Sequence, residues 1–219
     1  MIVPRHSLFL VMALLLGACA LGTVRDVDRM KQLTDAGDLE ALAAFEVDCA
    51  PATEGCAQAH MIRADACLRR AQETPVAGRA PYAACAVEDY EAALVAAAAR
   101  PDPLVDPLRL TRWELESLRL WRDAVARDQA AELNAELAEA AEQVAREQDT
   151  RPEGFYYLAD ARVWPVNAGL ERPACPAILQ ASRLVERAAA LADAGTVDVD
   201  QLRRDIDNAA RVHGCTIAS

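Results

Sequence analysis

Apolar positions recur along most of the chain at the three- and four-residue spacing of amphipathic helices, and no segment alternates apolar and polar residues in a sustained way. Glycine and proline fall between these periodic segments or near their ends. The pattern predicts helices at roughly 25–36, 38–48, 56–73, 80–99, 106–127, 129–148, 153–163, 176–193 and 198–213. Paired helices with short connections and no sheet predict an all-α fold of antiparallel helix hairpins.

Several predicted helix ends carry capping residues. Asp106-Pro107 places an N-cap before a proline at the first helical position, where no N–H is needed. Thr150 with Glu153, and Asp198 with Gln201, have the spacing of a capping box. These residues predict where three of the helices begin.

The stretch 108–149 contains neither Gly nor Pro, and we divide it near Asp128. One continuous helix of about 60 Å is the alternative. Apolar residues surround much of the first half, which predicts an inner helix: Leu108, Leu110, Trp113, Leu115, Leu118, Leu120, Trp121 and Val125. The second half has one narrow apolar stripe, which predicts an outer helix: Leu133, Leu137, Ala140 and Val144. Its separate acidic stripe is a solvated face or a docking surface for a basic partner: Glu132, Glu136 and Glu139.

The N-terminus has the features of an export signal. Arg5 precedes an apolar run from Leu8 to Leu16, which is too short for a hydrocarbon core that needs about 20 residues. The run ends in Leu16-Gly17-Ala18-Cys19, which resembles the lipobox of bacterial lipoproteins. The resemblance implies cleavage of the signal peptide 1–18 and attachment of a diacylglycerol to the thiol of Cys19. An ordinary signal peptide with a coincidental cysteine is the alternative.

The resemblance also implies a location. Two or more acyl chains anchor a protein stably to a bilayer. In Gram-negative lipoproteins an Asp after the lipidated cysteine favours retention in the inner membrane, whereas Ala20 and Leu21 follow Cys19 here. We therefore expect a bacterial envelope protein, anchored in the outer membrane and facing the periplasm. Residues 19–24 form the lipidated tether in this interpretation, and residues 25–219 form a single helical domain.

Six further cysteines follow Cys19. An even number of cysteines in an exported chain is typical of a disulfide framework, so we predict that these six are paired. Cys49 and Cys56 bracket a turn at 51–53, and the other neighbouring cysteines are equidistant from predicted turns near Val76 and Gly195. Residues equidistant from a hairpin turn face each other, so we predict the pairs Cys49–Cys56, Cys67–Cys85 and Cys175–Cys215. Free buried thiols are the alternative. No spacing typical of a zinc, haem or CxxC site occurs.

Two helices resemble tetratricopeptide repeats. Ala86, Tyr90 and Ala93 have the small–aromatic–small spacing of a repeat's second helix, and Ala181, Val185 and Ala188 repeat it with a smaller central residue. The segment 154–161 is similar to a first helix, and Ala36-Gly37-Asp38-Leu39 is similar to a turn between repeat helices. The resemblance implies a short, irregular α-solenoid that binds proteins. Ala86 and Ala181 are 95 residues apart, which is not a multiple of the 34-residue repeat, so an irregular helical bundle is the alternative.

Composition and the absence of known motifs exclude several classes of function. A net charge of -11 disfavours binding to nucleic acid, and a hydrophobic fraction of 53% excludes a disordered chain. No hydrolase, metalloprotease or nucleotide-binding motif occurs, and we expect neither a metal nor a cofactor. His60 near Asp65 is a weak candidate base, and His213 has the position of a helix C-terminal cap.

The sequence therefore favours a non-enzymatic envelope lipoprotein that binds protein partners. The candidate contact residues are the acidic stripe and five aromatic side chains, for which core packing is the alternative: Trp113, Trp121, Tyr156, Tyr157 and Trp164. The alternative function is a peptidoglycan enzyme, which requires two carboxyl groups about 5–10 Å apart, or a factor that recruits such an enzyme. A structural or lipid-binding domain is a third interpretation.

Overall fold

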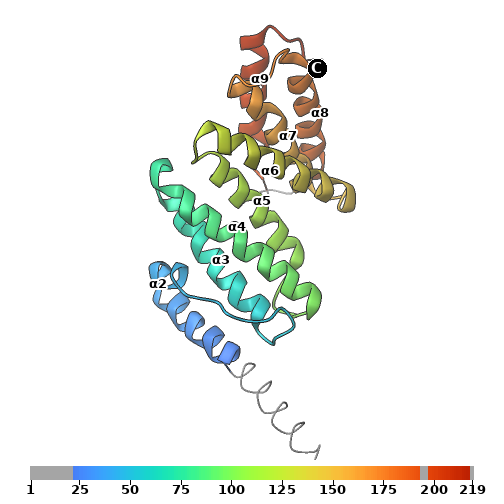
Figure 1. The fold of residues 1–219 in the computed structure, drawn as a ribbon. Helices are drawn as coiled ribbons and strands as arrows, with labels where there is room; N and C mark the ends of the chain where they lie inside the picture. Colours follow the sequence, from blue (N-terminus) through green and yellow to red (C-terminus); the bar gives the residue numbers. More distant parts are fainter. Residues whose placement is uncertain (1–21, 193–196, 218–219) are drawn as a thin grey trace, which may run out of the picture. The chain divides into compact units, whose positions relative to one another are not determined.

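The computed structural model describes residues 22–192 and 197–217, and these residues form helices and connecting loops without a strand (Figure 1). A helical segment at 22–36 precedes the labelled helices α2 (Leu39–Ala43), α3 (Cys56–Glu73), α4 (Val76–Ala99), α5 (Pro107–Arg122), α6 (Arg127–Glu147), α7 (Pro152–Asn167), α8 (Cys175–Leu191) and α9 (Val199–His213). Helices that are neighbours in sequence pack together, which confirms the all-α fold of helix pairs. None of the described helices has both the length and the apolar character needed to cross a bilayer.

The chain divides into two compact units, Met1–Leu120 and Trp121–Ser219. The first contains the helical segment 22–36, α2, α3, α4 and nearly all of α5, and the second contains α6 to α9. The predicted signal peptide and Cys19 lie outside the described residues.

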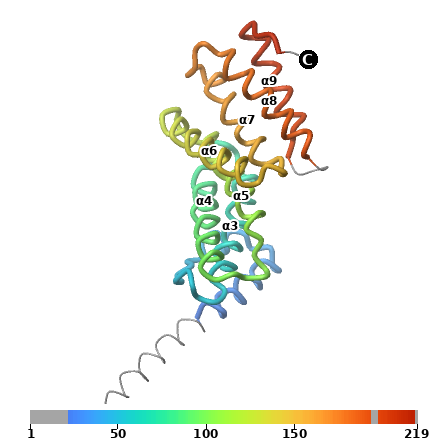
Figure 2. Tube along the Cα trace, turned by 90° about the vertical axis from the view of Figure 1, so that its right-hand side faces the viewer, coloured from blue at the N-terminus to red at the C-terminus, as the bar shows by residue number. Residues whose placement is uncertain are grey.

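Alanine dominates the core of the first unit. Helices α3 and α4 lie side by side (Figures 1 and 2), and most of the side chains that they bury are alanines. Short side chains let two helix axes approach closely. Ala86, Tyr90 and Ala93 are each 0% exposed, so the tyrosine fills the space between two small residues. This burial agrees with the packing that the small–aromatic–small spacing implies.

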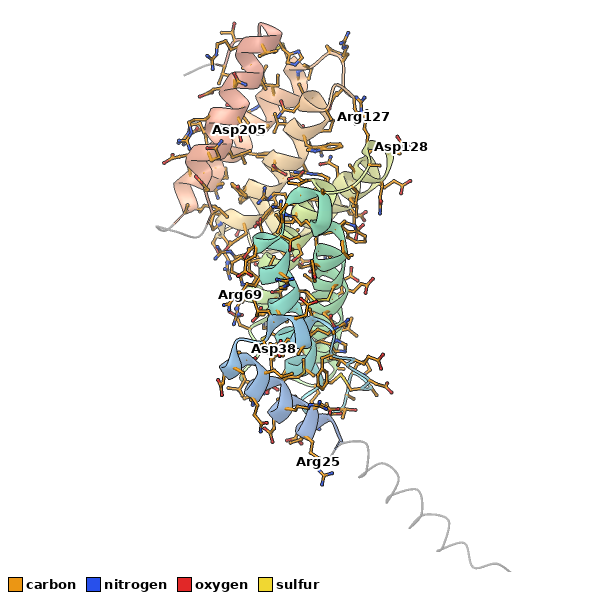
Figure 3. All side chains as sticks on the ribbon, turned by 90° about the vertical axis from the view of Figure 1, so that its left-hand side faces the viewer. Arg25, Asp38, Arg69, Arg127, Asp128 and Asp205 are labelled. Carbon is orange, nitrogen blue, oxygen red and sulfur yellow. A yellow bond between two sulfur atoms is a disulfide. The ribbon has the colours of Figure 1, made fainter. Side chains whose placement is uncertain are left out.

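A smaller apolar cluster joins the segment 22–36 and α2 to α3 through the buried residues Val27, Met30, Leu42, Ala59 and Ala66. The predicted turn before α2 is present: Gly37 has a φ of 70°, and the Asp38 carboxylate (labelled in Figure 3) accepts a hydrogen bond of 3.1 Å from the Ala41 N–H. Helix α2 ends at Ala43 and not near 48 as predicted. The chain leaves the helix there and packs Phe45 against the cluster on its way to the disulfide at Cys49.

Helices α7, α8 and α9 form the core of the second unit, and α6 packs on α7 (Figure 2). The predicted positions Ala181, Val185 and Ala188 of α8 are at most 1% exposed. The predicted cap of α9 is confirmed, because the Asp198 carboxylate accepts a 3.0 Å hydrogen bond from the Gln201 N–H. On the surface, Arg203 of α9 pairs with Glu186 of α8 at 2.8 Å.

Two helix boundaries near α6 differ from the prediction. The stretch 106–148 forms two helices, as we divided it, but the break lies at 123–126 and not near Asp128. The Thr150 capping box is wrong: α7 begins at Pro152 with Arg151 as its N-cap residue. Glu153 instead accepts a 2.9 Å hydrogen bond from the Arg151 guanidinium, so an ion pair uses the carboxylate that a capping box needs.

All three predicted disulfides are present, with Cα–Cα distances of 5.8 Å for Cys49–Cys56, 5.9 Å for Cys67–Cys85 and 5.5 Å for Cys175–Cys215. The second links the packed helices α3 and α4, and the third links the start of α8 to the chain after α9. Each pair therefore fixes the register of neighbouring elements.

Gly154 of α7 packs closely against the backbone of α6. A Cβ atom at this position would lie 2.4 Å from the backbone nitrogen of Ala145 in α6. We expect Gly154→Ala to force α6 and α7 apart and to lower the free energy of unfolding by about 1–3 kcal/mol or more, measured by urea unfolding followed by circular dichroism. The control is Gly78→Ala, at an exposed helical glycine of α4, where alanine has the higher helix propensity. Equal stability of the two variants would contradict the close contact.

Candidate functional site

The five aromatic candidates have different environments. Trp113 belongs to the first unit, where the Arg112 guanidinium lies 4.6 Å from its ring centre. The other four belong to the second unit. Tyr156 and Tyr157 contact each other edge to face at 5.0 Å; Tyr157 is buried, and Tyr156 packs partly buried against the core. Trp121 and Trp164 are both partly buried, and Trp164 lines a cavity that is described below.

A proline in α7 creates the central polar contact of this unit. Pro165 lies inside the helix and has no N–H to donate to the carbonyl of Ala161, four residues earlier. The side chain of Asn134 in α6 supplies the missing hydrogen bond, because its amide nitrogen donates to the Ala161 carbonyl at 3.0 Å. Helix α7 therefore continues past Pro165 to Asn167, four residues beyond the predicted end at 163.

The oxygen of the same Asn134 amide accepts a 3.0 Å hydrogen bond from Arg122, the last residue of α5, which is 2% exposed. The Arg122 guanidinium also donates to Asp160 at 2.6 Å and to Asp123 at 2.8 Å. Its carbon lies 5.4 Å from the Trp164 ring centre. The buried cation thus has two carboxylates, an amide and an aromatic face as partners, which is the arrangement that a charge removed from water requires.

Arg122 and Trp164 line an open cavity of about 530 Å³, which we call the tryptophan cavity. The other lining residues are Asp123, Val125, Arg127, Ala130 and Ala168. Arg127, at the start of α6 beside Asp128 (Figure 3), donates from its guanidinium to the Ala168 carbonyl and closes one side. The cavity combines one indole face with charged groups that are already paired.

A second cavity of about 270 Å³ lies between α6, α7 and α8, and we call it the alanine groove. Small and polar residues line it: Ala131, Asn134, Ala135, Ala138, Ala161, Arg162, Pro165, Glu171, Pro176, Ala177 and Gln180. The Nε atom of Arg162 is buried and has no hydrogen-bond partner among the described residues. The groove therefore offers space beside short side chains, with polar side chains on its wall.

The predicted acidic stripe flanks this groove. Glu132, Glu136 and Glu139 are exposed on α6, and each follows a groove alanine by one residue. One residue corresponds to a rotation of about 100° around a helix, so the stripe runs along the helix beside the alanines. The predicted apolar stripe of α6 faces the core, because Leu133, Leu137 and Val144 are buried and Ala140 is partly buried.

A separate polar cluster lies in the first unit. The predicted pair of His60 and Asp65 does not form: His60 Nδ1 lies 2.7 Å from Asp89, a buried residue of α4 that also accepts a 2.9 Å hydrogen bond from Arg63. Asp65 instead accepts a 2.7 Å hydrogen bond from the buried Tyr90 hydroxyl. Burial, followed by the Asp65 carboxylate, raises the pKa of Tyr90 above its ordinary value, so the hydroxyl stays a donor.

Comparisons of the chain with models of known protein families, with curated proteins and with solved structures find no match. The side chains that line the tryptophan cavity and the alanine groove are suited to binding, because they offer apolar surface, amides and charged groups with fixed partners. Arg122 and Asn134 were not among the predicted site residues. The sequence feature that points to them is Pro165, because a proline inside a helix leaves the carbonyl four residues earlier without its usual donor.

We expect Arg122→Ala to lower the free energy of unfolding of the chain by about 3–5 kcal/mol, because Asp160 and the Asn134 amide lose their buried partner. Urea unfolding followed by circular dichroism measures this loss. Arg204→Ala serves as the control: this residue of α9 is exposed and contacts Gln201, and its loss should change stability by at most about 0.5 kcal/mol. A similar small effect at Arg122 would show that the network contributes little.

Proposed function

We propose that this chain is a lipid-anchored protein of the bacterial envelope that acts as a non-enzymatic protein-interaction module. The alanine groove with its flanking acidic stripe is the observation that carries the proposal. Grooves of this kind bind a helix or an extended segment that places a few anchor side chains between the helices. The partner is another envelope protein.

The lining of the groove supports a peptide ligand. Short alanine side chains leave room for one or two large apolar anchors of the partner, since a cavity of about 270 Å³ holds no more. Gln180 and Arg162 on its wall provide amide and guanidinium groups for the partner's backbone. Polar groups beside an apolar pocket favour a polypeptide, which brings both apolar side chains and backbone hydrogen-bonding groups.

Charge supports a basic partner. The chain carries 34 acidic against 23 basic residues, and exposed glutamates follow one edge of the groove. Complementary charge increases the rate of encounter and fixes the orientation of a partner more than it increases affinity. A segment with lysine or arginine residues beside an apolar anchor would match the stripe and the groove together.

Anchoring completes the proposal. Cys19 precedes the helical segment 22–36 by only a few residues. Acyl chains on its thiol and amine would hold the first unit close to the bilayer and confine the partner search to the envelope. The location in the outer membrane rests on Ala20 and Leu21, which follow the cysteine in place of an acidic residue.

The groove can be tested by site-specific photocrosslinking in intact envelopes. We expect a benzoylphenylalanine at Ala135, in the groove, to crosslink a discrete protein, and the same probe at Ala190, an exposed alanine of α8, to give no such product. Glu132→Lys combined with Glu139→Lys should reduce the crosslink at Ala135 at least several-fold, because the stripe then repels a basic segment. Equal crosslinking at both alanines, or a yield unchanged by charge reversal, would reject the groove as the binding surface.

The anchor requires its own test. Cys19→Ala removes the thiol that the lipobox resemblance predicts to carry diacylglycerol, so labelling with a palmitate analogue should disappear and the protein should leave the membrane fraction. Cys49→Ala with Cys56→Ala is the control, since it removes two other cysteines and should leave labelling unchanged. Labelling that persists in Cys19→Ala would refute the lipobox.

A further inference from the structure

The disulfide Cys49–Cys56 differs from the other two in its surroundings. Cys56 is the first residue of α3 and is 1% exposed, whereas Cys49 is partly exposed in the loop that precedes this helix. A thiolate that attacks the pair from solvent therefore reaches the Cys49 sulfur first, and the Cys56 sulfur is the leaving group. Thiol–disulfide exchange proceeds faster, and further, when the departing thiolate is stabilised.

The start of α3 stabilises such a thiolate. The helix has 18 residues, and no side chain caps its first turn, since the N-cap residue is Gly55. N–H groups and the positive end of the helix dipole favour an anion at this position. Cysteines at helix N-termini accordingly have enhanced thiolate character. The sulfur of Cys56 belongs to the first helical residue and is covalently held at this end.

His60, one turn further along α3, adds a second contribution. One of its ring nitrogens lies within 4.8 Å of the sulfur atoms of both Cys49 and Cys56. Its Nδ1 lies 2.7 Å from the Asp89 carboxylate, which is 2% exposed and is also held by Arg63 at 2.9 Å. The imidazole is thus fixed beside the disulfide, near the sulfur that would carry the departing charge. A neighbouring protonated histidine favours the thiolate form of a cysteine.

We propose that Cys49–Cys56 is a redox-active disulfide that oxidises a dithiol of an external polypeptide. One substrate thiolate attacks the Cys49 sulfur, the bond between the two cysteine sulfurs breaks, and its electron pair leaves on Cys56 as a thiolate. The second substrate thiolate then attacks the mixed disulfide and releases Cys49 as a thiolate. The substrate loses two electrons and becomes a disulfide, and Cys49 and Cys56 gain them as a dithiol pair once protons are taken up.

The other two disulfides serve as internal references. Cys67 and Cys85 are held together by the packing of α3 on α4, and the Asp89 carboxylate lies 3.7 Å from the Cys85 sulfur, where it opposes a thiolate. Cys175 is also the first residue of a helix, α8, which has no side-chain cap. Within the described residues, however, the cysteine pairs that have a third histidine or carboxylate group within 4.8 Å are Cys49–Cys56 with His60 and Cys67–Cys85 with Asp89. Cys175–Cys215 therefore isolates the effect of the helix end from that of the histidine.

The purified chain tests the proposal in dithiothreitol redox buffers, with alkylation of free thiols and peptide mass mapping of each pair. We expect Cys49–Cys56 to be reduced first, with an equilibrium constant for reduction at least tenfold above those of Cys67–Cys85 and Cys175–Cys215, which corresponds to about 30 mV. The helical circular dichroism should persist at that stage. Reduction of either other pair at the same poise or earlier, or reduction of Cys49–Cys56 only together with loss of helical signal, would overturn the proposal.

A variant assigns the role of the histidine. His60→Asn keeps a polar side chain beside Asp89 and should lower the equilibrium constant for reduction of Cys49–Cys56 several-fold toward that of Cys175–Cys215. His213→Asn, at the exposed histidine that ends α9, is the matched control and should leave Cys49–Cys56 unchanged. An unchanged Cys49–Cys56 equilibrium in folded His60→Asn would remove His60 from the site. In a separate assay, one disulfide should form in a reduced peptide dithiol for each Cys49–Cys56 disulfide that is reduced. If the native protein oxidises none of this peptide, the proposed redox activity is rejected, independently of any ligand of the alanine groove.

Discussion

The packing of alanine against alanine is the constraint on which the rest of this structure depends. Buried alanines line α3 and α4 in the first unit and α8 in the second, and α6 and α7 each bury two more. Short side chains bring helices close, as at Gly154, where no Cβ fits against the Ala145 backbone. They also bury little apolar area per residue, at about 25 cal/mol per Å², and they interdigitate less than larger side chains. Alanine packing therefore permits close contact without strongly specifying one register.

Polar and covalent contacts supply the missing specificity. In the first unit, the buried Tyr90 lies between the small residues Ala86 and Ala93, and its hydroxyl reaches Asp65 on the neighbouring helix. In the second, Asn134 satisfies the carbonyl that Pro165 frees and also holds the buried Arg122. Each of these contacts is lost if a helix slides by one turn, and two disulfides oppose the same displacement. Fold specificity thus comes from few residues in an otherwise uniform core.

Local rules predicted the helices and the disulfides well, because both depend on residues near each other in sequence. Helical periodicity and glycine or proline breaks set most boundaries, and distance from a turn gave the partner of each cysteine. Two predictions failed because a distant side chain decided the outcome. Pro165 was treated as a helix end because nothing in its own segment shows that Asn134 would satisfy Ala161. His60 was paired with Asp65 on its own helix, whereas Asp89 comes from α4.

The Asn134 amide also bears on the binding proposed for the alanine groove. This residue lines the alanine groove, but its oxygen accepts from Arg122 and its nitrogen donates to Ala161. A ligand that competed for either atom would expose a buried guanidinium or an orphan carbonyl, at a cost of about 1–3 kcal/mol or more. In the proposed complex, a partner would therefore contact groups outside this network, namely Gln180, Arg162 and the glutamates of α6, while the network keeps α6 and α7 in position. A groove whose floor is fixed in this way loses little conformational entropy on binding, and preorganisation of that kind increases affinity without adding contacts.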